Sequence, residues 1–167
     1  AKSNIDKGDK LYDQGTVYYK QALEPYLLAN NFNSENALLN YKIGNCYLHS
    51  NNKLKSIPFL EKSLKLNIHV DQQIHYMLGL AYHLDMQWDK AVNEYKIFQG
   101  GLSNSTENKI IYEDVLKKIQ ECNNGKTLTT KPVRVFIDNV GDGVNSAFSD
   151  YCPLITADES TMIFTSR

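Results

Sequence analysis

The side chains with the most obvious chemical potential in this sequence are four histidines, which could coordinate a metal ion. Helical zinc sites place two ligands three or four residues apart, so that both side chains leave the same face. His49, His69, His75 and His83 show no such spacing. The histidines therefore do not indicate a metal site, and we expect no cofactor.

A second possibility lies in the acidic and glycine residues near the carboxyl end. Asp138, Asp142 and Gly143 match part of a calcium loop, but the other acidic ligands and the closing Glu are missing. A phosphate-binding loop would be followed by a helix beginning with Lys-Ser or Lys-Thr, and none follows here. The segment 141–143 is therefore predicted to be a turn.

The three cysteines, Cys46, Cys122 and Cys152, form neither a metal-ligand spacing nor an even disulfide set. Cys46 belongs to a helical pattern that favours packing over reactivity. Several helix layers should separate it from Cys122, so both thiols are expected to be free. No nucleophile motif is found, and the sequence predicts a protein that is not an enzyme.

Composition narrows the classes of partner. Eighteen Lys plus Arg oppose nineteen Asp plus Glu, and the formal net charge is -1. A protein that binds nucleic acid normally carries a basic surface, so we expect no nucleic-acid partner. No apolar run approaches the roughly 18 to 20 residues that span a bilayer, and no direct membrane insertion is expected.

A repeat of 35 residues organises the first part of the chain. Residues 41–48 align with residues 76–83, with a glycine at the same place in each, Gly44 and Gly79. A glycine inside a helix costs about 1 kcal/mol relative to alanine, which indicates that close helix packing compensates for it. The following segments also agree: Ser56, Leu60 and Ser63 align with Ala91, Tyr95 and Phe98.

This pattern resembles the tetratricopeptide repeat, in which two helices form a hairpin. Residues 3–34 supply a weaker copy, with Ala22, Tyr26 and Ala29 in the second helix. Gly15 lies too far from Ala22 for the usual spacing, which leaves the register of the first helix open. The resemblance implies an all-α solenoid of about three repeats.

A last helix is predicted to cap this stack. Asn104 and Glu107 form a capping-box pattern, and apolar residues at helical spacing continue to Cys122. Segment 123–125, Asn-Asn-Gly, is expected to stop the helix. We therefore predict a repeat domain over 1–122 with a capping helix over 104–122, followed by a linker over 123–132.

From Lys131 onward the pattern changes to that of β-strands. Val133, Val135 and Ile137 alternate with other residues, and 161–165 is a second strand candidate after a turn at 157–160. Because an isolated hairpin is marginal in water, this tail needs a partner sheet.

Strings in this tail resemble the opening blade of a WD-type β-propeller: Val144-Asn145-Ser146, Asp150-Tyr151-Cys152-Pro153, Ile155-Thr156-Ala157-Asp158-Glu159 and Ile163-Phe164-Thr165-Ser166-Arg167. Tetratricopeptide repeats before such a blade are similar to a bacterial outer-membrane family that ends in an OmpA-like, peptidoglycan-binding domain. Some members serve type IX secretion or gliding. The resemblance implies that 133–167 begins a truncated propeller and that the chain is the amino-terminal part of a longer protein.

In tetratricopeptide proteins the first helices line a concave groove. The groove positions of the family, carried across, are Leu38, Tyr41, Asn45, Leu48, His49, Gln73, Tyr76, Leu80, His83 and Leu84. The carboxylate clamp of this family needs Lys, Asn and Arg at set positions, where Tyr41 and Met77 stand instead. We therefore expect a protein or peptide partner in the groove, but no acidic chaperone tail.

Together these expectations describe a non-catalytic interaction scaffold. The family resemblance implies a location in the periplasm, in an outer-membrane-associated complex of the type IX secretion kind. Any link to peptidoglycan would run through domains that this chain does not contain. The alternative is a free-standing intracellular tetratricopeptide adaptor whose β-like tail is a linker.

Overall fold

The structure is a computed structural model that describes residues 2–103, 105–136, 138–141, 143–145 and 151–165, without the side chains of residues 106 and 107. The chain divides into two compact units, Ala1–Lys131 and Pro132–Arg167. Each unit is described by itself.

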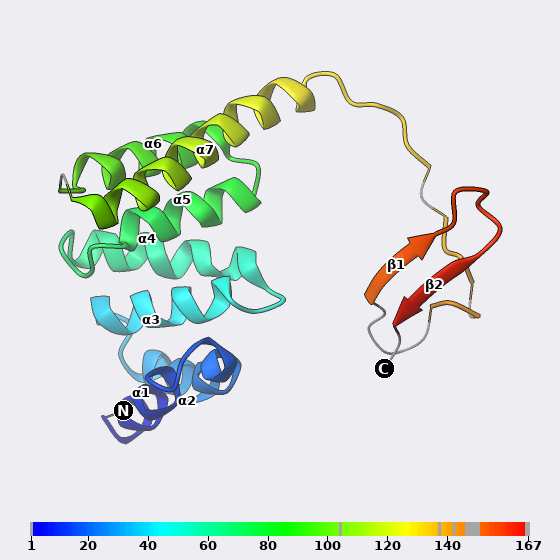
Figure 1. Cartoon of the computed structure of the whole chain (residues 1–167). Helices are drawn as coiled ribbons and strands as arrows, with labels where there is room; N and C mark the ends of the chain where they lie inside the picture. Colours follow the sequence, from blue (N-terminus) through cyan, green and yellow to red (C-terminus); the bar gives the residue numbers. More distant parts are fainter. Residues whose placement is uncertain (1, 104, 137, 142, 146–150, 166–167) are drawn as a thin grey trace. The chain divides into compact units, whose positions relative to one another are not determined.

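The first unit is a stack of α-helices (Figure 1). Its elements are α1 (Lys2–Tyr12), α2 (Tyr19–Phe32), α3 (Ala37–Leu48), α4 (Ser56–Leu66), α5 (Ile74–Leu84), α6 (Trp88–Gly100) and α7 (Thr106–Thr129), with short 3-10 turns at Thr16–Tyr18 and Lys53–Lys55. Helices α1 to α6 pack as the successive hairpins α1–α2, α3–α4 and α5–α6, and α7 packs on α6. The mostly helical class predicted from the sequence is confirmed.

Glycines hold the two helices of each hairpin close together. A Cβ atom added at Gly44 would lie 2.5 Å from Leu60 Cγ, and one at Gly79 would lie 2.6 Å from Tyr95 Cδ1. Gly44 and Gly79 thus occupy equivalent sites, as their shared place in the repeat predicted. Gly8 is the equivalent residue in the first hairpin, since a Cβ atom added there would lie 2.4 Å from Tyr26 Cε1. This position fixes the register of the first helix, which the sequence left open.

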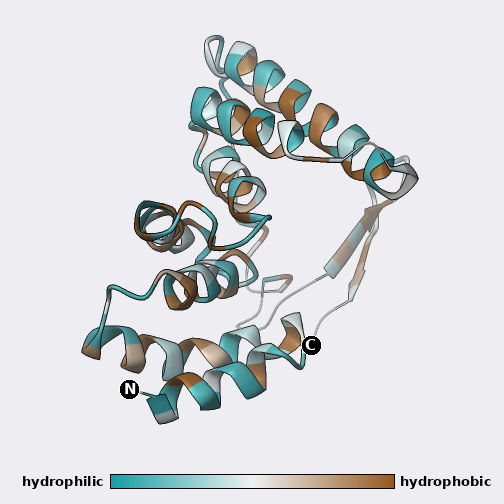
Figure 2. Ribbon diagram, turned by 90° about the vertical axis from the view of Figure 1, so that its left-hand side faces the viewer, coloured by the Kyte–Doolittle hydropathy of each residue, from teal (hydrophilic) through white to brown (hydrophobic). Residues whose placement is uncertain are grey.

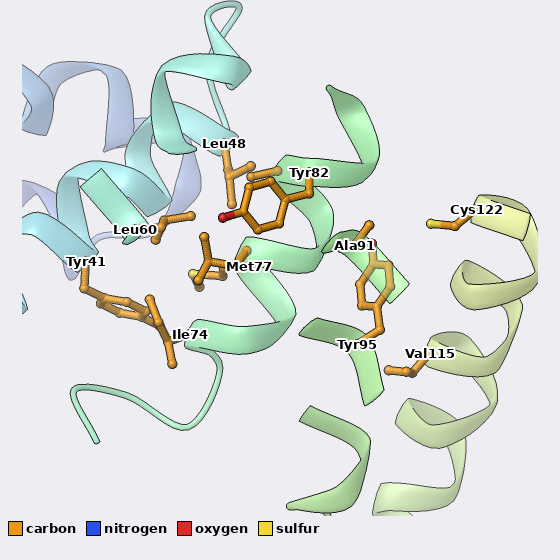
Figure 3. Packing of buried hydrophobic residues seen from close by; sticks show 12 residues of the cluster. Tyr41, Leu48, Leu60, Ile74, Met77, Tyr82, Ala91, Tyr95, Val115 and Cys122 are labelled. Carbon is orange, nitrogen blue, oxygen red and sulfur yellow. The ribbon is translucent and has the colours of Figure 1, made fainter. Parts of the chain in front are cut away.

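Two clusters of buried side chains hold the stack together. Hydrophobic and hydrophilic residues alternate along its helices (Figure 2). One cluster joins α2 to α3 and contains Ala22, Tyr26, Ala29, Leu39, Ile43 and Cys46. The other runs from α3 to α7, with Tyr95 beside Val115 (Figure 3). Each hairpin therefore buries its apolar face against its neighbours.

The predicted end of the capping helix is wrong, because α7 continues past Cys122 to Thr129. Gly125 does not stop the helix. It lets α7 approach α6, since an added Cβ would lie 2.8 Å from the Trp88 ring. The next residue, Lys126, binds Asp89 at 2.6 Å. Most of the predicted linker 123–132 is therefore helical.

The start of α7 also differs from the prediction. Ser105 is its N-cap, and its hydroxyl accepts a hydrogen bond from the Asn108 amide at 3.2 Å. Asn104, which the predicted capping box used, lies outside the described residues.

The second unit contains an antiparallel pair of strands, β1 (Tyr151–Ile155) and β2 (Met162–Thr165). Strand β2 confirms the candidate at 161–165, and the turn before it is where the sequence placed it. The strand predicted from Val133 to Ile137 is wrong over residues 133–136, which form no strand, and Ile137 lies outside the described residues. Alternation alone does not make a strand, because a strand also needs a partner for its amides.

Candidate functional site: the first-helix face

The predicted groove residues lie on α3 and α5, except His49, which directly follows α3, and Gln73, which directly precedes α5. Together with α1, these helices form what we call the first-helix face. Four of the ten are exposed: Leu38, His49, Gln73 and Leu84. Leu38 and Leu84 each expose 49% of their surface. These two leucines are the large apolar side chains that the face offers to a partner.

Three predicted groove residues are buried instead: Tyr41, Asn45 and Leu48. Tyr41 exposes 6% of its surface and packs beside Ile74 (Figure 3). Burial, with the nearby Asp71 carboxylate, raises the pKa of the Tyr41 phenol. Tyr41 thus belongs to the core, where it can hold the face together but offers little surface to a ligand.

The remaining three, Tyr76, Leu80 and His83, are half-buried. The Tyr76 hydroxyl donates to Asp114 Oδ2 at 2.9 Å and so connects α5 to α7. Burial and the Asp114 carboxylate raise the pKa of Tyr76 to about 12. Burial lowers the pKa of His83, whose ring lies edge-on to Trp88 at 5.7 Å. Both rings are therefore neutral near pH 7.

Polar side chains also connect α1 to α3 across this face. Lys42 Nζ lies 2.7 Å from Asp9 Oδ1, and the Tyr26 hydroxyl donates to the same oxygen at 2.7 Å. The Asn45 amide donates to the Tyr12 hydroxyl. Partly buried bonds of this kind help to fix the spacing of successive helices, because breaking one leaves a polar group without its partner.

An aromatic cluster lies where α1 ends. The rings of Tyr12 and Tyr19 stack with centroids 4.5 Å apart, and His49 meets Tyr19 edge-on at 5.2 Å. His49 Nδ1 is 2.9 Å from the Asn45 carbonyl oxygen, so this exposed histidine is held in place by its own helix. A rigid exposed ring is suited to contact with a partner at low entropic cost.

The two cysteines of the helical unit, Cys46 and Cys122, are buried. Burial raises the pKa of Cys46 to about 12 and also raises that of Cys122, so both thiols stay protonated near neutral pH. Across the residues that the structure describes, no three His, Cys, Asp or Glu side chains gather as a metal site would require. None of the helices in the described ranges has the length and apolar character needed to cross a membrane.

Comparison with known proteins identifies a similar fold but no matching family. No family model matches the chain, and no curated protein matches it. Among solved structures, the type III secretion translocator chaperone SycD of Yersinia enterocolitica is similar, with a TM-score of 0.60 and 12% identity over 76% of this chain and 86% of that chain. At this identity the likeness supports a shared tetratricopeptide-like helical fold and nothing finer.

Sequence reasoning missed several residues that shape the face. Gly8 could have been found by extending the repeat one step towards the amino end, since it precedes Gly44 by 36 residues. The Asp9–Lys42 pair had no such signal, because its members lie on different helices. Asp114 was not among the predicted groove residues, yet it accepts a hydrogen bond from Tyr76.

Proposed function

We propose that this protein is a non-catalytic scaffold that binds a protein or peptide partner on its first-helix face. The observation that carries the proposal is a rigid, cross-linked face that exposes Leu38, His49, Gln73 and Leu84 while its neighbouring side chains are occupied internally. A few exposed anchors on a fixed frame suit recognition, because little conformational freedom is lost on binding. One similar solved structure is that of a translocator chaperone, which favours a protein partner.

The setting that we propose is the periplasm, in an outer-membrane-associated complex of the type IX secretion kind. Peptidoglycan would be reached only through domains beyond this chain. Support comes from the resemblance of residues 131–167 to a propeller blade, and the antiparallel pair β1–β2 is compatible with part of one. A signal sequence upstream and a propeller downstream in the gene would distinguish this setting from an intracellular adaptor.

The binding face can be tested without disturbing the fold, because its anchors are exposed. We expect the double variant Leu38→Asp, Leu84→Asp to lose at least about tenfold in capture of a partner from cells of the source organism, as two apolar anchors become charged. The matched control is Ile110→Asp, Leu128→Asp on α7, where both side chains are also exposed.

Capture is quantified by mass spectrometry against the wild-type chain, and circular dichroism verifies that both variants keep their helices. Equal capture by the two double variants would remove the first-helix face from the proposal. Loss with the α7 control alone would move the site to the end of the stack.

A further inference from the structure

Helix α7 is docked on the stack by a short apolar strip. Val115 and Cys122 are fully buried and point towards α6 (Figure 3), and Ile119 between them is partly buried. These three side chains hold one side of a helix of 24 residues. Little apolar surface is therefore buried per turn of α7, and its free energy of docking should be lower than that of the stack as a whole.

Two polar bonds also connect α7 to the hairpin α5–α6. The Tyr76 hydroxyl donates to Asp114 Oδ2 at 2.9 Å, and Lys126 Nζ lies 2.6 Å from Asp89 Oδ1. The side chains of Lys126 and Asp89 are 54% and 81% exposed, and exposed ion pairs contribute little to stability. The partly buried bond from Tyr76 is therefore the stronger of the two polar connections.

The turn that joins α6 to α7 contains two glycines, Gly100 and Gly101, that the closed structure does not require. Gly101 has a φ of −87°, which any residue adopts. Nothing lies within 4 Å of a Cβ atom added at Gly100, and the atom nearest to one added at Gly101 is the Phe98 carbonyl oxygen at 3.5 Å. Neither backbone conformation nor packing accounts for the pair. Two adjacent residues with the widest range of backbone angles suit a hinge.

The hydrogen bonds on the two sides of this turn belong to different helices. The Leu102 amide donates to the Gln99 carbonyl oxygen of α6 at 3.2 Å. The Asn108 side chain of α7 donates to the Ser103 carbonyl oxygen at 2.8 Å. The side-chain nitrogen of Gln99 is buried and has no partner among the described residues. A buried donor without a partner destabilises the closed position, and opening would expose it to water.

We propose that α7 is a lid that opens about the Gly100–Gly101 pair while α1 to α6 stay folded. Opening uncovers Tyr95, which lies beside Val115 when α7 is docked. It also uncovers Trp88, whose ring lies against Gly125. Both rings belong to α6, and exposed aromatic side chains are typical of surfaces that bind partners. The lid thus controls access to a second contact surface, whether or not the first-helix face binds a partner.

The three cysteines make the opening measurable, because each reports a different event. Cys152 is exposed in the strand unit, Cys122 is buried between α6 and α7, and Cys46 is buried between α2 and α3. A buried thiol is alkylated only when its surroundings open. The test is the rate at which iodoacetamide alkylates each cysteine of the full 167-residue chain, located by mass spectrometry of its peptides.

Cys152 should react first, and Cys46 only when the stack unfolds. We expect Cys122 to react at least about tenfold faster than Cys46 and with a weaker dependence on urea, because opening a lid exposes less surface than unfolding does. Equal rates and equal urea dependence for Cys122 and Cys46 would overturn the proposal. A rate for Cys122 equal to that of Cys152 would overturn it too, since α7 would then not be docked.

Tyr76→Phe keeps the ring but removes the hydroxyl that bonds to Asp114. It should accelerate alkylation of Cys122 by about threefold to tenfold, because the docked position loses one hydrogen bond. The matched control is Tyr82→Phe, which removes a bond of 2.6 Å from the same helix to Glu61 on α4. The control should leave the Cys122 rate unchanged, and equal acceleration by both variants would contradict a lid.

The hinge is tested by the double variant Gly100→Ala, Gly101→Ala. Alanine fits the closed turn but narrows the range of backbone angles available to an open one, so Cys122 should react about two- to fivefold more slowly. An unchanged rate would mean that α7 detaches by fraying from its far end, which would overturn the hinged lid.

Discussion

The two units of this chain differ in how fully they bury their large apolar side chains. In the helical unit the central aromatics, Tyr26 and Tyr95, are fully buried by neighbouring helices. In the strand unit the cross-strand pair Leu154 and Ile163 stays mostly exposed. Each helical hairpin finds its partner within about 35 residues along the sequence, whereas a two-stranded ribbon needs strands from elsewhere. A short segment of stacked helical repeats can therefore bury its apolar side chains, whereas a sheet segment of similar length cannot.

The largest expected effect is a loss of stability that differs between a core substitution in the helical unit and a surface substitution in the strand unit. Tyr95→Ala should lower the free energy of unfolding by about 3–5 kcal/mol, because it empties a fully buried site between α5, α6 and α7. Leu154→Ala, on the exposed ribbon, should change it by at most about 0.5 kcal/mol. Urea unfolding followed by circular dichroism at 222 nm measures both. Comparable losses would mean that the ribbon shares the helical core.

A smaller effect tests the close approach within a hairpin. Gly79→Ala should cost about 1–3 kcal/mol, because the added methyl would overlap the Tyr95 ring 2.6 Å away. This cost works against the better helix propensity of alanine. Gly100→Ala is the matched control, since nothing lies within 4 Å of its added Cβ. The control should leave stability unchanged or slightly raised, and the same urea titration compares the two. A neutral Gly79→Ala would show that α5 and α6 can separate without loss.

Much of the helical unit could be predicted from the sequence, because a repeated pattern reports local packing. Gly44 and Gly79 revealed the hairpins in this way. Gly125 misled the prediction, since a glycine that ends a helix and a glycine that admits a neighbouring ring look alike in a sequence. Only the position of Trp88 on another helix distinguishes them.

The candidate site was less predictable than the fold. Family positions selected Leu38 and Leu84, which are exposed, but they also selected Tyr41 and Asn45, which are buried. Burial at these positions depends on neighbours such as Tyr12 that come from a different hairpin. That the face binds a partner stays a prediction.

The smallest expected effect concerns the polar bonds that join α1 to α3. Partial burial alone would raise the pKa of Asp9, but the bonds from Lys42 and Tyr26 and the charge of Lys42 outweigh it, and the pKa lies below its usual value. A lowered pKa in the folded state stabilises the fold above the unfolded value of about 3.9, and this contribution is lost as pH falls through the folded pKa. Asp9→Asn should therefore cost roughly 0.2–1 kcal/mol at pH 7, since the pair is partly exposed, and progressively less below about pH 4.

Urea midpoints of the wild type and Asp9→Asn at pH 7 and pH 3 measure this change. Asp13→Asn, one turn further along the chain and exposed, is the control and should behave like the wild type at both values. A difference between Asp9→Asn and the wild type that persists undiminished at pH 3 would show that the side chain acts by shape, because the contribution of its charge to stability declines once the pH is below the unfolded value of about 3.9. A difference confined to neutral pH would assign the coupling of α1 to α3 to the charge shared by Asp9 and Lys42. In the strand unit the Asp158 carboxylate accepts hydrogen bonds from Thr156 and Ser160 in the turn between β1 and β2, and these bonds lower its pKa. This turn should therefore also lose stability as the pH falls through the folded pKa of Asp158.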